Sequence, residues 1–366
     1  MERFDAIVVG AGPAGSATAI RLACGGARVL LADRARFPRD KPCGGGVTGR
    51  AVRELPCAID PVVEDVVHSL EVRLRYRKRF EGRSEAPLVL MTRRRRLDAF
   101  LVEQAAAAGA DFRDGVTIEG LTIGPDGGEL TVGGKRVGAT AIVGADGVNG
   151  SLARATGIGG GIVYGIALEG NGPLPAGQQG RATVELGVIP GGYGWVFPKD
   201  GHANYGVGGW ASEGPRLREH LRRLCGAHGV DSSALTDLHG RRLPIRRTNA
   251  ARRGPVLLAG DAAGLVDPLS GDGIYEALVS ARLAAAAILE GRLDKYEDEL
   301  FALLDGYAET SWKAKLVLDR HPRAAFAIAR LPGVWPVIAG LIAGNVAHPR
   351  DARGLARPPL RLLARL

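Results

Sequence analysis

The first 33 residues constrain the fold more than any other part of the sequence. Residues 4–9 form an apolar run typical of a buried parallel strand, and a glycine-rich turn, a small-residue helix and a second apolar run follow. Gly10 permits a tight turn, Gly12 lets the backbone approach a pyrophosphate, and Gly15 lets helix and strand pack closely. Asp33 ends the second run, where a carboxylate can accept hydrogen bonds from ribose hydroxyls. The segment predicts a dinucleotide-binding βαβ unit.

Two later segments repeat the pattern of a strand that delivers an acid to a glycine turn. Residues 141–147 end in Asp146 and Gly147, and residues 255–259 run into Asp261. Each is followed by a predicted helix, the second of which begins near Asp272 and ends near residue 289. We expect Asp261 to accept from a ribityl hydroxyl, and the glycines at 264, 271 and 273 to lie against a flat ring. The positive end of the second helix would stabilise an anionic reduced flavin.

In their order and spacing, these three landmarks resemble those of the p-hydroxybenzoate hydroxylase superfamily, which implies FAD. The fold that the resemblance implies is α/β: a doubly wound, Rossmann-like FAD-binding domain, an antiparallel β-sheet substrate domain and a helical C-terminal region. We expect the FAD domain at residues 1–60, 92–160 and 245–300, the substrate domain at 61–91 and 161–244, and the helical region at 301–366. The predicted cofactor site comprises Gly10, Gly12, Ala14, Gly15, Asp33, Arg34, Cys43, Gly44, Gly45, Arg94, Val116, Asp146, Gly147, Asp261, Gly271, Gly273 and Ile274.

Two further motifs resemble the geranylgeranyl reductase family. One is the loop 37–46, which contains Lys-Pro-Cys-Gly-Gly-Gly, and the other is P-x-x-Y-x-W-x-F-P at 190–198 with a trailing G-x-G at 206–208. The resemblance implies an FAD-dependent enzyme that saturates C=C bonds of a geranylgeranyl or other isoprenoid chain on a lipid, menaquinone or diphosphate. NADPH or a ferredoxin-type carrier protein would supply the electrons. The alternative is an FAD-dependent monooxygenase that hydroxylates an aromatic or polyketide-like substrate.

The second motif also indicates a binding surface. Tyr193, Trp195 and Phe197 alternate along a predicted strand, so all three side chains point to one face. Gly206 and Gly208 alternate likewise on the next strand and would leave a smooth hollow beside the aromatic side chains. An aromatic wall facing a glycine floor suits a long apolar ligand, although ordinary sheet packing gives the same pattern.

Individual roles follow from the family resemblance. The loop that carries Cys43 passes close to the flavin in the family, so its thiol would donate a proton or hold the substrate, or else simply fill space. Arg94 would pair with the FAD phosphates or ribityl chain. The backbone near Val116 would receive the adenine. Acids shorter than the family's usual Glu stand at Asp33 and Asp272.

Composition and charge limit which ligands, partners and cellular locations we expect. The net charge of +9 fits a phosphorylated ligand, an anionic membrane surface or a solvated basic surface, and we expect no nucleic-acid partner. The four cysteines form no CxxC pair, so no metal site is predicted, and we expect a cytoplasmic protein. No apolar run reaches the roughly 20 residues of a spanning helix. The apolar segment 333–347 and the arginines at 353, 357, 361 and 365 predict either a peripheral contact with the inner face of the membrane or a helical lid.

Overall fold

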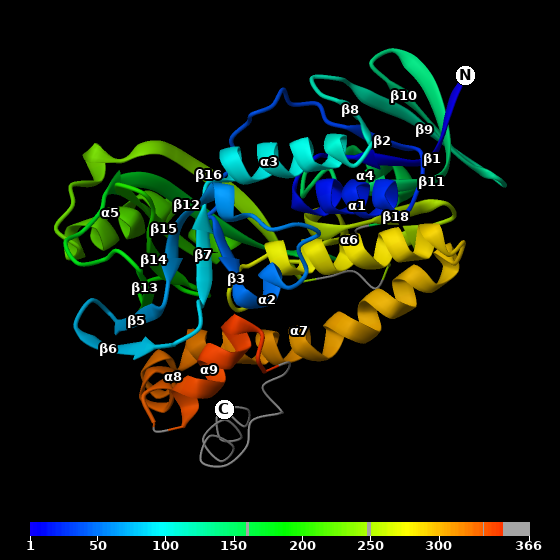
Figure 1. Ribbon diagram of the computed structural model, residues 1–366. Helices are drawn as coiled ribbons and strands as arrows, with labels where there is room; N and C mark the ends of the chain where they lie inside the picture. Colours follow the sequence, from blue (N-terminus) through cyan, green and yellow to red (C-terminus); the bar gives the residue numbers. More distant parts are fainter. Residues whose placement is uncertain (159–160, 247–249, 332, 347–366) are drawn as a thin grey trace.

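The computed structural model describes residues 1–158, 161–246, 250–331 and 333–346, and the arginines of the basic tail lie outside this part of the chain. A mainly parallel sheet forms the first layer (Figure 1). Its strands run in the order β17-β18-β11-β1-β2-β8, and the β9–β10 hairpin extends from β11. Their bounds are β1 Glu2–Val9, β2 Val29–Ala32, β8 Asp111–Arg113, β9 Ile118–Gly124, β10 Gly127–Val132, β11 Lys135–Gly144, β17 Arg252–Arg253 and β18 Val256–Leu258.

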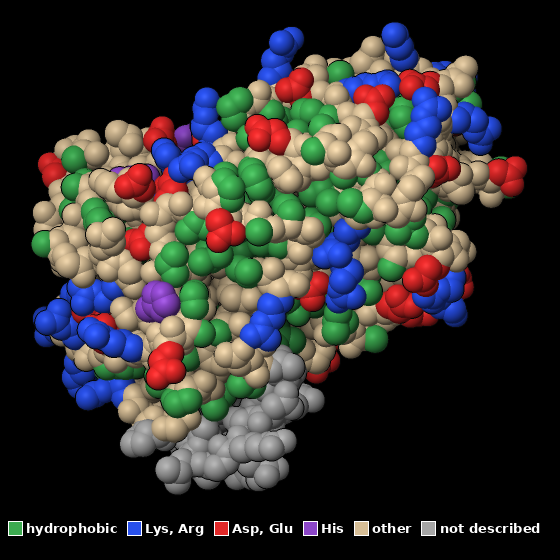
Figure 2. All heavy atoms as spheres, viewed as in Figure 1, with side chains coloured by type: hydrophobic (Ala, Val, Ile, Leu, Met, Phe, Trp, Pro, Cys, Tyr) green, Lys and Arg blue, Asp and Glu red, His purple; other side chains and the backbone are tan. Residues whose placement is uncertain are grey.

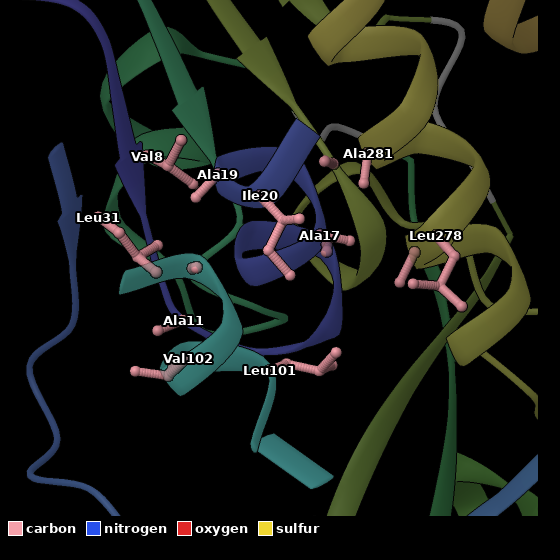
Figure 3. Packing of buried hydrophobic residues seen from close by; sticks show 14 of the residues in the cluster. Val8, Ala11, Ala17, Ala19, Ile20, Leu31, Leu101, Val102, Leu278 and Ala281 are labelled. Atoms are coloured by element: carbon pink, nitrogen blue, oxygen red, sulfur yellow. The ribbon is translucent and has the colours of Figure 1, made fainter. Parts of the chain in front are cut away.

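Three helices pack on one another over this sheet: α1 (Pro13–Cys24), α3 (Arg94–Ala107) and α6 (Ile274–Leu289). Small residues let them approach closely, and Figure 3 shows Ala17 and Ile20 of α1 beside Leu278 and Ala281 of α6. Every residue of α1 from Pro13 to Ile20 is buried. This burial is possible because the helix has no charged residue before Arg21. The packing fixes the N-termini of α1 and α6 at the carboxyl ends of the parallel strands, where ligands bind in open α/β sheets.

A second, mostly antiparallel sheet has the order β16-β12-β15-β14-β13-β5-β6. Helix α5 (Leu217–Ala227) covers one face, where its leucines pack on Tyr205 and Val207. The strands are β5 Ser69–Leu74, β6 Lys78–Arg83, β12 Val163–Pro173, β13 Arg181–Leu186, β14 Tyr193–Pro198, β15 His202–Trp210 and β16 Thr236–Arg246. Because side chains alternate along a strand, the residues between those that face α5 point to the opposite face, toward the first layer.

Smaller elements close the space between the two layers. A three-stranded sheet of β3 (Gly46–Thr48), β7 (Val89–Thr92) and β4 (Val63–Val67) lies with α2 (Gly49–Val52) near α6. The long helix α7 (Tyr296–Arg320) runs back beneath α6, and α8 (Pro322–Ala329) and α9 (Val334–Ala343) then pack on β5 and β6 (Figure 1). The remaining short elements are α4 (Ser151–Thr156), η1 (Asp60–Val62), η2 (Ala211–Arg216), η3 (Ser232–Ala234), η4 (Gly260–Ala263) and η5 (Leu293–Lys295).

The C-terminal helices are too short or too polar for any one of them to span a membrane. Among the described helices, none is by itself both long enough and apolar enough to cross a membrane. Helices α8 and α9 reach that length and apolarity only together, as a bent pair.

The alternating apolar pattern of residues 66–76 predicts one strand, residues 111–118 predict another, and the structure divides both. The run 66–76 ends one strand at Val67 and begins another at Ser69, because the chain passes at His68 from the three-stranded sheet to the larger one, where the backbone N–H of His68 donates to Gly180. The run 111–118 breaks after β8, since Gly115 takes a φ of +62° in a turn whose Asp114 accepts from the backbone N–H of Phe37. The predicted domain boundaries remain a prediction.

Candidate active site

A cavity of about 980 Å³ lies between the two layers and reaches from the glycine turn after β1 to the C-terminal helices. At one end it is lined by the backbone of several glycines, and along its length by aliphatic side chains of the second sheet and of α8 and α9. These aliphatic residues include Leu70, Val72, Val184, Leu186, Ile328, Ile338, Leu341 and Ile342. A space with a polar, glycine-lined end and long apolar walls fits a cofactor beside a lipophilic small molecule.

The glycine turn has the shape expected for a pyrophosphate site. A Cβ on Gly10 would stand 2.4 Å from the Ala145 oxygen, and a Cβ on Gly15 only 1.7 Å from the Gly10 oxygen, so both positions exclude any side chain. At Gly12 the nearest atoms are guanidinium nitrogens of Arg39 and Arg94, both 3.6 Å from a Cβ built there. The open cradle at Gly12, bordered by two guanidinium groups, therefore suits a diphosphate.

Arg94 is held rigidly toward this cradle. Its guanidinium donates to both carboxylate oxygens of Asp98 at 2.8 Å, and Arg39 lies 2.9 Å from the same carboxylate. Burial opposes the charge of Arg94, but Asp98 outweighs burial and raises the pKa of Arg94 above its ordinary value. Arg39 was missed in the sequence, although it lies within the quoted loop 37–46.

The expected adenosine side is arranged around Asp33. Its carboxylate accepts from the backbone N–H of Ala11 at 2.7 Å and of Ala35 at 2.8 Å, so it braces the glycine turn in this structure. Arg34 is exposed directly after it. The N–H of Val116 donates to the Asp33 carbonyl, which leaves the Val116 carbonyl as the backbone group for a ligand. The roles of Asp33, Arg34 and Val116 in FAD binding stay predictions.

Asp146 stabilises the start of α4 and retains a free oxygen. Its Oδ2 accepts from the backbone N–H groups of Ser151 at 2.6 Å and Leu152 at 3.2 Å. Its Oδ1 is buried and has no hydrogen-bond partner among the described residues. Burial raises the pKa of the Asp146 carboxyl. Gly147 lines the cavity whereas Asp146 does not, so the role of Asp146 in FAD binding stays a prediction.

Asp261 lies at the centre of a charged cluster. Its Oδ2 is 3.2 Å from Lys41 Nζ and accepts from Arg241 Nη2 at 3.1 Å. Burial raises the pKa of Asp261, but Lys41 and Arg241 outweigh burial and lower it to about 2. The carboxylate is therefore ionised and can accept from a ribityl hydroxyl. Lys41 and Arg241 are further residues that the sequence reasoning missed.

The start of α6 faces the cavity. Gly271, Gly273 and Ile274 line it, and the Ile274 N–H donates to Asp272 Oδ1 at 2.9 Å. The φ of +67° at Gly271 is favourable for glycine alone among the common residues. The backbone thus presents the positive end of a 16-residue helix to the place where a flat ring would lie.

Taken together, these features fit FAD. Arg39, Arg94 and the Gly12 cradle would hold the diphosphate, Asp261 the ribityl chain, and residues 271–274 the ring. When bound, FAD supplies the two-electron redox chemistry that no amino-acid side chain provides. Within the described residues, no group of His, Cys, Asp or Glu could hold a metal ion.

The predicted aromatic wall is present on β14. Tyr193, Trp195 and Phe197 all line the cavity, with ring centroids 6.0 Å and 6.1 Å apart along the row. Gly208 lines the cavity as well. Gly206 does not, because the indole of Trp195 lies over it: a Cβ on Gly206 would stand 2.0 Å from the ring. The space expected to be open at Gly206 is therefore filled by the indole of Trp195.

Asn204 holds that indole in place. Its Oδ1 accepts from Trp195 Nε1 at 2.8 Å, and both residues are buried. Asn204 was missed, although it alternates in phase with Gly206 and Gly208 on β15 and could have been assigned to the same face.

The Cys43 loop is fixed against the second sheet. Lys199, which directly follows the aromatic motif, donates to the Gly44 carbonyl at 2.6 Å and to the Thr92 carbonyl at 2.9 Å. Gly45 has a φ of +70°, and its backbone N–H lies 3.4 Å from Cys43 Sγ. Cys43 is partly buried and lines the cavity with Gly44 and Gly45. Its catalytic role stays a prediction.

The comparisons with known proteins agree with this geometry. A family model described as an FAD binding domain matches residues 3–163. The menaquinone reductase of Mycolicibacterium smegmatis is 31% identical over 397 residues, covering 97% of this chain and 95% of that protein. The chloroplastic geranylgeranyl diphosphate reductase of Oryza sativa is 31% identical over 347 residues, covering 87% and 74%. The chain belongs to the geranylgeranyl reductase family.

A solved structure supports the fold of this family member over its whole length. The geranylgeranyl bacteriochlorophyll reductase-like protein of Thermoplasma acidophilum aligns with a TM-score of 0.83, at 23% identity, over 99% of this chain and 100% of that one. The predicted α/β class, the FAD cofactor and the family resemblance are confirmed. This member of the geranylgeranyl reductase family is an FAD-dependent oxidoreductase.

Proposed function

We propose that this protein is an FAD-dependent prenyl reductase that saturates C=C bonds of a geranylgeranyl or other isoprenoid chain. The observation that carries the proposal is the single cavity in which the glycine-lined flavin end continues into a long apolar channel. A prenyl chain is apolar along its whole length, and only such a channel buries it completely. Relatives named for geranylgeranyl diphosphate and menaquinone point to the same class of substrate.

The residues divide the work between binding and orientation. The aromatic rings of β14 would contact the prenyl chain and orient it toward the flavin end. Asn204 fixes the ring of Trp195 through its hydrogen bond. Leu341 and Ile342 of α9 line the same cavity. An isolated alkene is a poor electrophile, so alignment of the reacting carbons and a correctly placed proton must supply much of the rate. A prenyl chain bound along the apolar walls would displace water from the neighbourhood of the reduced cofactor.

We propose NADPH or a ferredoxin-type carrier as the electron donor. We propose that the prenyl chain belongs to a lipid, to menaquinone or to a diphosphate. Exposed basic residues surround the β5–β6 hairpin, next to α8 and α9, at the lower left of Figure 2: Arg75, Arg77, Lys78, Arg79 and Arg83. A basic surface beside apolar helices supports a peripheral contact with an anionic membrane, from which a lipid substrate would enter.

Mass spectrometry tests the reaction. Purified, chemically reduced holoenzyme is incubated without oxygen with geranylgeranyl diphosphate, a geranylgeranylated lipid or menaquinone, and then with NADPH in air. We expect anaerobic products heavier by pairs of hydrogens. No anaerobic product, with a gain of one oxygen atom in air, would establish the monooxygenase instead.

A pair of variants tests the channel in the same assay. Ile338→Trp fills the channel from α9, whereas Leu331→Trp adds the same indole at a residue that is 43% exposed. We expect the first to reduce turnover of long prenyl chains and the second to leave it unchanged. Equal effects of the two substitutions would exclude the channel as the binding site.

A further inference from the structure

Glu169 is a buried carboxyl group on the cavity wall that neither sequence motif contains. It lies on β12, where it pairs with Gly206 of β15, and Gly206 in turn pairs with Trp195 of β14. Residues paired across neighbouring strands point to the same face, so Glu169 and Trp195 share the cavity face on either side of a residue without a side chain. Glu169 is 5% exposed and lines the cavity.

The groups around Glu169 come from several elements. The backbone N–H of Cys43, from the loop beside the flavin end, lies close enough to favour its carboxylate form. Arg241 and His239 of β16 and Lys199 after β14 also act on it electrostatically. Arg241 and Lys199 already donate hydrogen bonds elsewhere, to Asp261 and to the carbonyls of Gly44 and Thr92. The carboxyl group therefore lies next to Cys43 while its cationic neighbours are engaged by other acceptors.

Comparison of the acids in the cavity separates Glu169 from the rest. Four carboxyl groups line the cavity in the described part of the chain, at Glu169, Asp261, Asp267 and Asp272. Asp261 lies against Lys41 and Arg241; Asp272 caps α6 and lies 3.5 Å from Arg50 Nη2. Asp267 accepts from Ser270 and Ser311. These three carboxyl groups therefore already interact with cations, with hydroxyl groups or with the N-terminus of a helix.

Glu169 also differs from Asp261 in the direction in which its surroundings shift the pKa. Burial raises the pKa of Glu169 above its ordinary value, and Arg241, the Cys43 amide, Lys199 and His239 only reduce that rise. The pKa of Asp261 is instead held at about 2 by its two cations. A carboxyl group on the cavity wall whose pKa is raised by burial is suited to act as a general acid.

We propose that Glu169 donates the proton that completes saturation of the alkene, an inference that rests on the proposed prenyl reduction. The O–H bond of the Glu169 carboxyl breaks and a C–H bond forms at one alkene carbon. The other carbon gains a hydride equivalent from reduced FAD, so the π bond is lost, the cofactor is oxidised and the substrate gains two hydrogens. Glu169 is left as a carboxylate and regains its proton from solvent before the next turnover.

Single-turnover kinetics of Glu169→Gln test the role. The amide keeps the size of the side chain and an acceptor for the Cys43 N–H, but it has no acidic proton. We expect dithionite to reduce the bound flavin of the variant as in the wild type, while anaerobic flavin reoxidation by a prenyl substrate slows about 100-fold or more. Glu169→Asp should recover part of the rate, and retention of the flavin absorbance shows that each variant is folded.

The pH profile and the infrared spectrum give readouts that a purely structural role would not change. Wild-type reoxidation should fall as pH rises through the pKa of Glu169, and the profile of Glu169→Gln should lose this limb. In infrared titration of the holoenzyme without substrate, one carbonyl-stretch band of a protonated carboxyl group should be present in the wild type and absent in Glu169→Gln, whereas bands from other buried acids with raised pKa values, Asp146 and Glu276, should be unchanged.

Glu185→Gln serves as the matched control. Glu185 is fully buried in the same sheet but faces away from the cavity and lies 2.8 Å from Arg73 Nε. We expect it to keep the wild-type reoxidation rate and the infrared band assigned to Glu169. If Glu169→Gln reoxidises at the wild-type rate or keeps the band, Glu169 is not the acid. If wild-type enzyme reduces no prenyl substrate, the proposed function fails, and the infrared result still decides whether Glu169 carries a proton.

Discussion

At the scale of single residues, the binding wall depends on polar contacts that an aromatic motif does not reveal. The three rings of β14 all line the cavity, and the orientation of Trp195 is set by residues of β15. Gly206 admits the indole beneath the cavity surface, and Asn204 fixes its rotation through one hydrogen bond. The aromatic wall therefore depends on two small or polar residues of the neighbouring strand.

Asn204→Leu tests this dependence. The substitution leaves the Trp195 N–H, in a side chain only 8% exposed, without its acceptor, so we expect a loss of about 1–3 kcal/mol in the free energy of unfolding. Denaturant unfolding of the holoenzyme gives the value. In a Trp195→Phe background there is no N–H to satisfy, and the same substitution should cost clearly less. An identical cost in both backgrounds would contradict the assigned hydrogen bond.

At the scale of elements, the loop before β3 connects the flavin end to the second sheet. Gly45 takes a left-handed φ that brings its backbone against β7, where the Thr92 N–H donates to the Gly45 carbonyl at 2.7 Å. Lys199 secures the preceding carbonyl from the opposite side. Cys43 is thus placed by backbone geometry, and position 45 must be a glycine to allow the approach to β7.

Gly45→Ala should disturb this loop more than an equivalent change elsewhere. A Cβ at Gly45 would stand 1.9 Å from the Thr92 oxygen, in addition to the cost of about 1–2 kcal/mol for a left-handed alanine. Gly26 has a φ of +84° with nothing within 4 Å, so Gly26→Ala measures the conformational cost alone. We expect the larger loss of unfolding free energy, and weaker FAD binding by fluorescence titration, for Gly45→Ala only. Equal losses would show that the loop does not pack as described.

At the scale of the whole molecule, the cavity exists because two sheets and the C-terminal helices enclose it from different sides. Helix α7 is fastened to the second sheet: Asp319 accepts from the Gly191 N–H at 2.6 Å and from Trp210 Nε1 at 2.8 Å. Lys315, a buried lysine of the same helix, donates to the Gly191 carbonyl. Burial lowers the pKa of both Lys315 and Lys199 to about 8, so global stability must depend on pH in the alkaline range.

Lys199→Met isolates one of these contributions. An unfolded lysine has a pKa of about 10.4, so between pH 8 and 10.4 the unfolded chain binds more protons at this residue than the folded chain does. Stability contributed by Lys199 therefore rises with pH across this window, and its charging cost is fully present below about pH 8. We expect the stability of the wild type relative to Lys199→Met to increase by up to about 3 kcal/mol on going from pH 8 to 10.4.

Thermal or denaturant unfolding of both holoenzymes at each pH gives this difference, and the contribution of Lys315 cancels because both proteins contain it. The exposed Lys78→Met is the control and should give a difference that does not change with pH. A constant difference for Lys199→Met would contradict the burial of its charge.

The family resemblance implied the FAD cofactor, whereas residue spacing by itself predicted the βαβ unit and the row of aromatic side chains on one face of a strand. These features depend on short-range patterns: Gly10, Gly12 and Gly15 act within one turn, and Tyr193, Trp195 and Phe197 share a face because a strand alternates with period two. Such local geometry can be deduced from residue spacing without knowledge of the partner elements. The split of residues 66–76 between two sheets was missed because the hydrophobic pattern does not change where the hydrogen-bonding partner does.

The tertiary structure alone decided how distant residues meet. Glu169 and Cys43 are far apart in sequence, and Lys41, Asp261 and Arg241 come from different segments, so no spacing rule predicts that they line one cavity. Whether a buried acid is ionised depends on the charges that folding places around it: Asp261 meets two cations, whereas burial dominates at Glu169. Charge interactions act through space rather than along the chain, and for this reason the chemistry of the site could be assigned only from the folded structure.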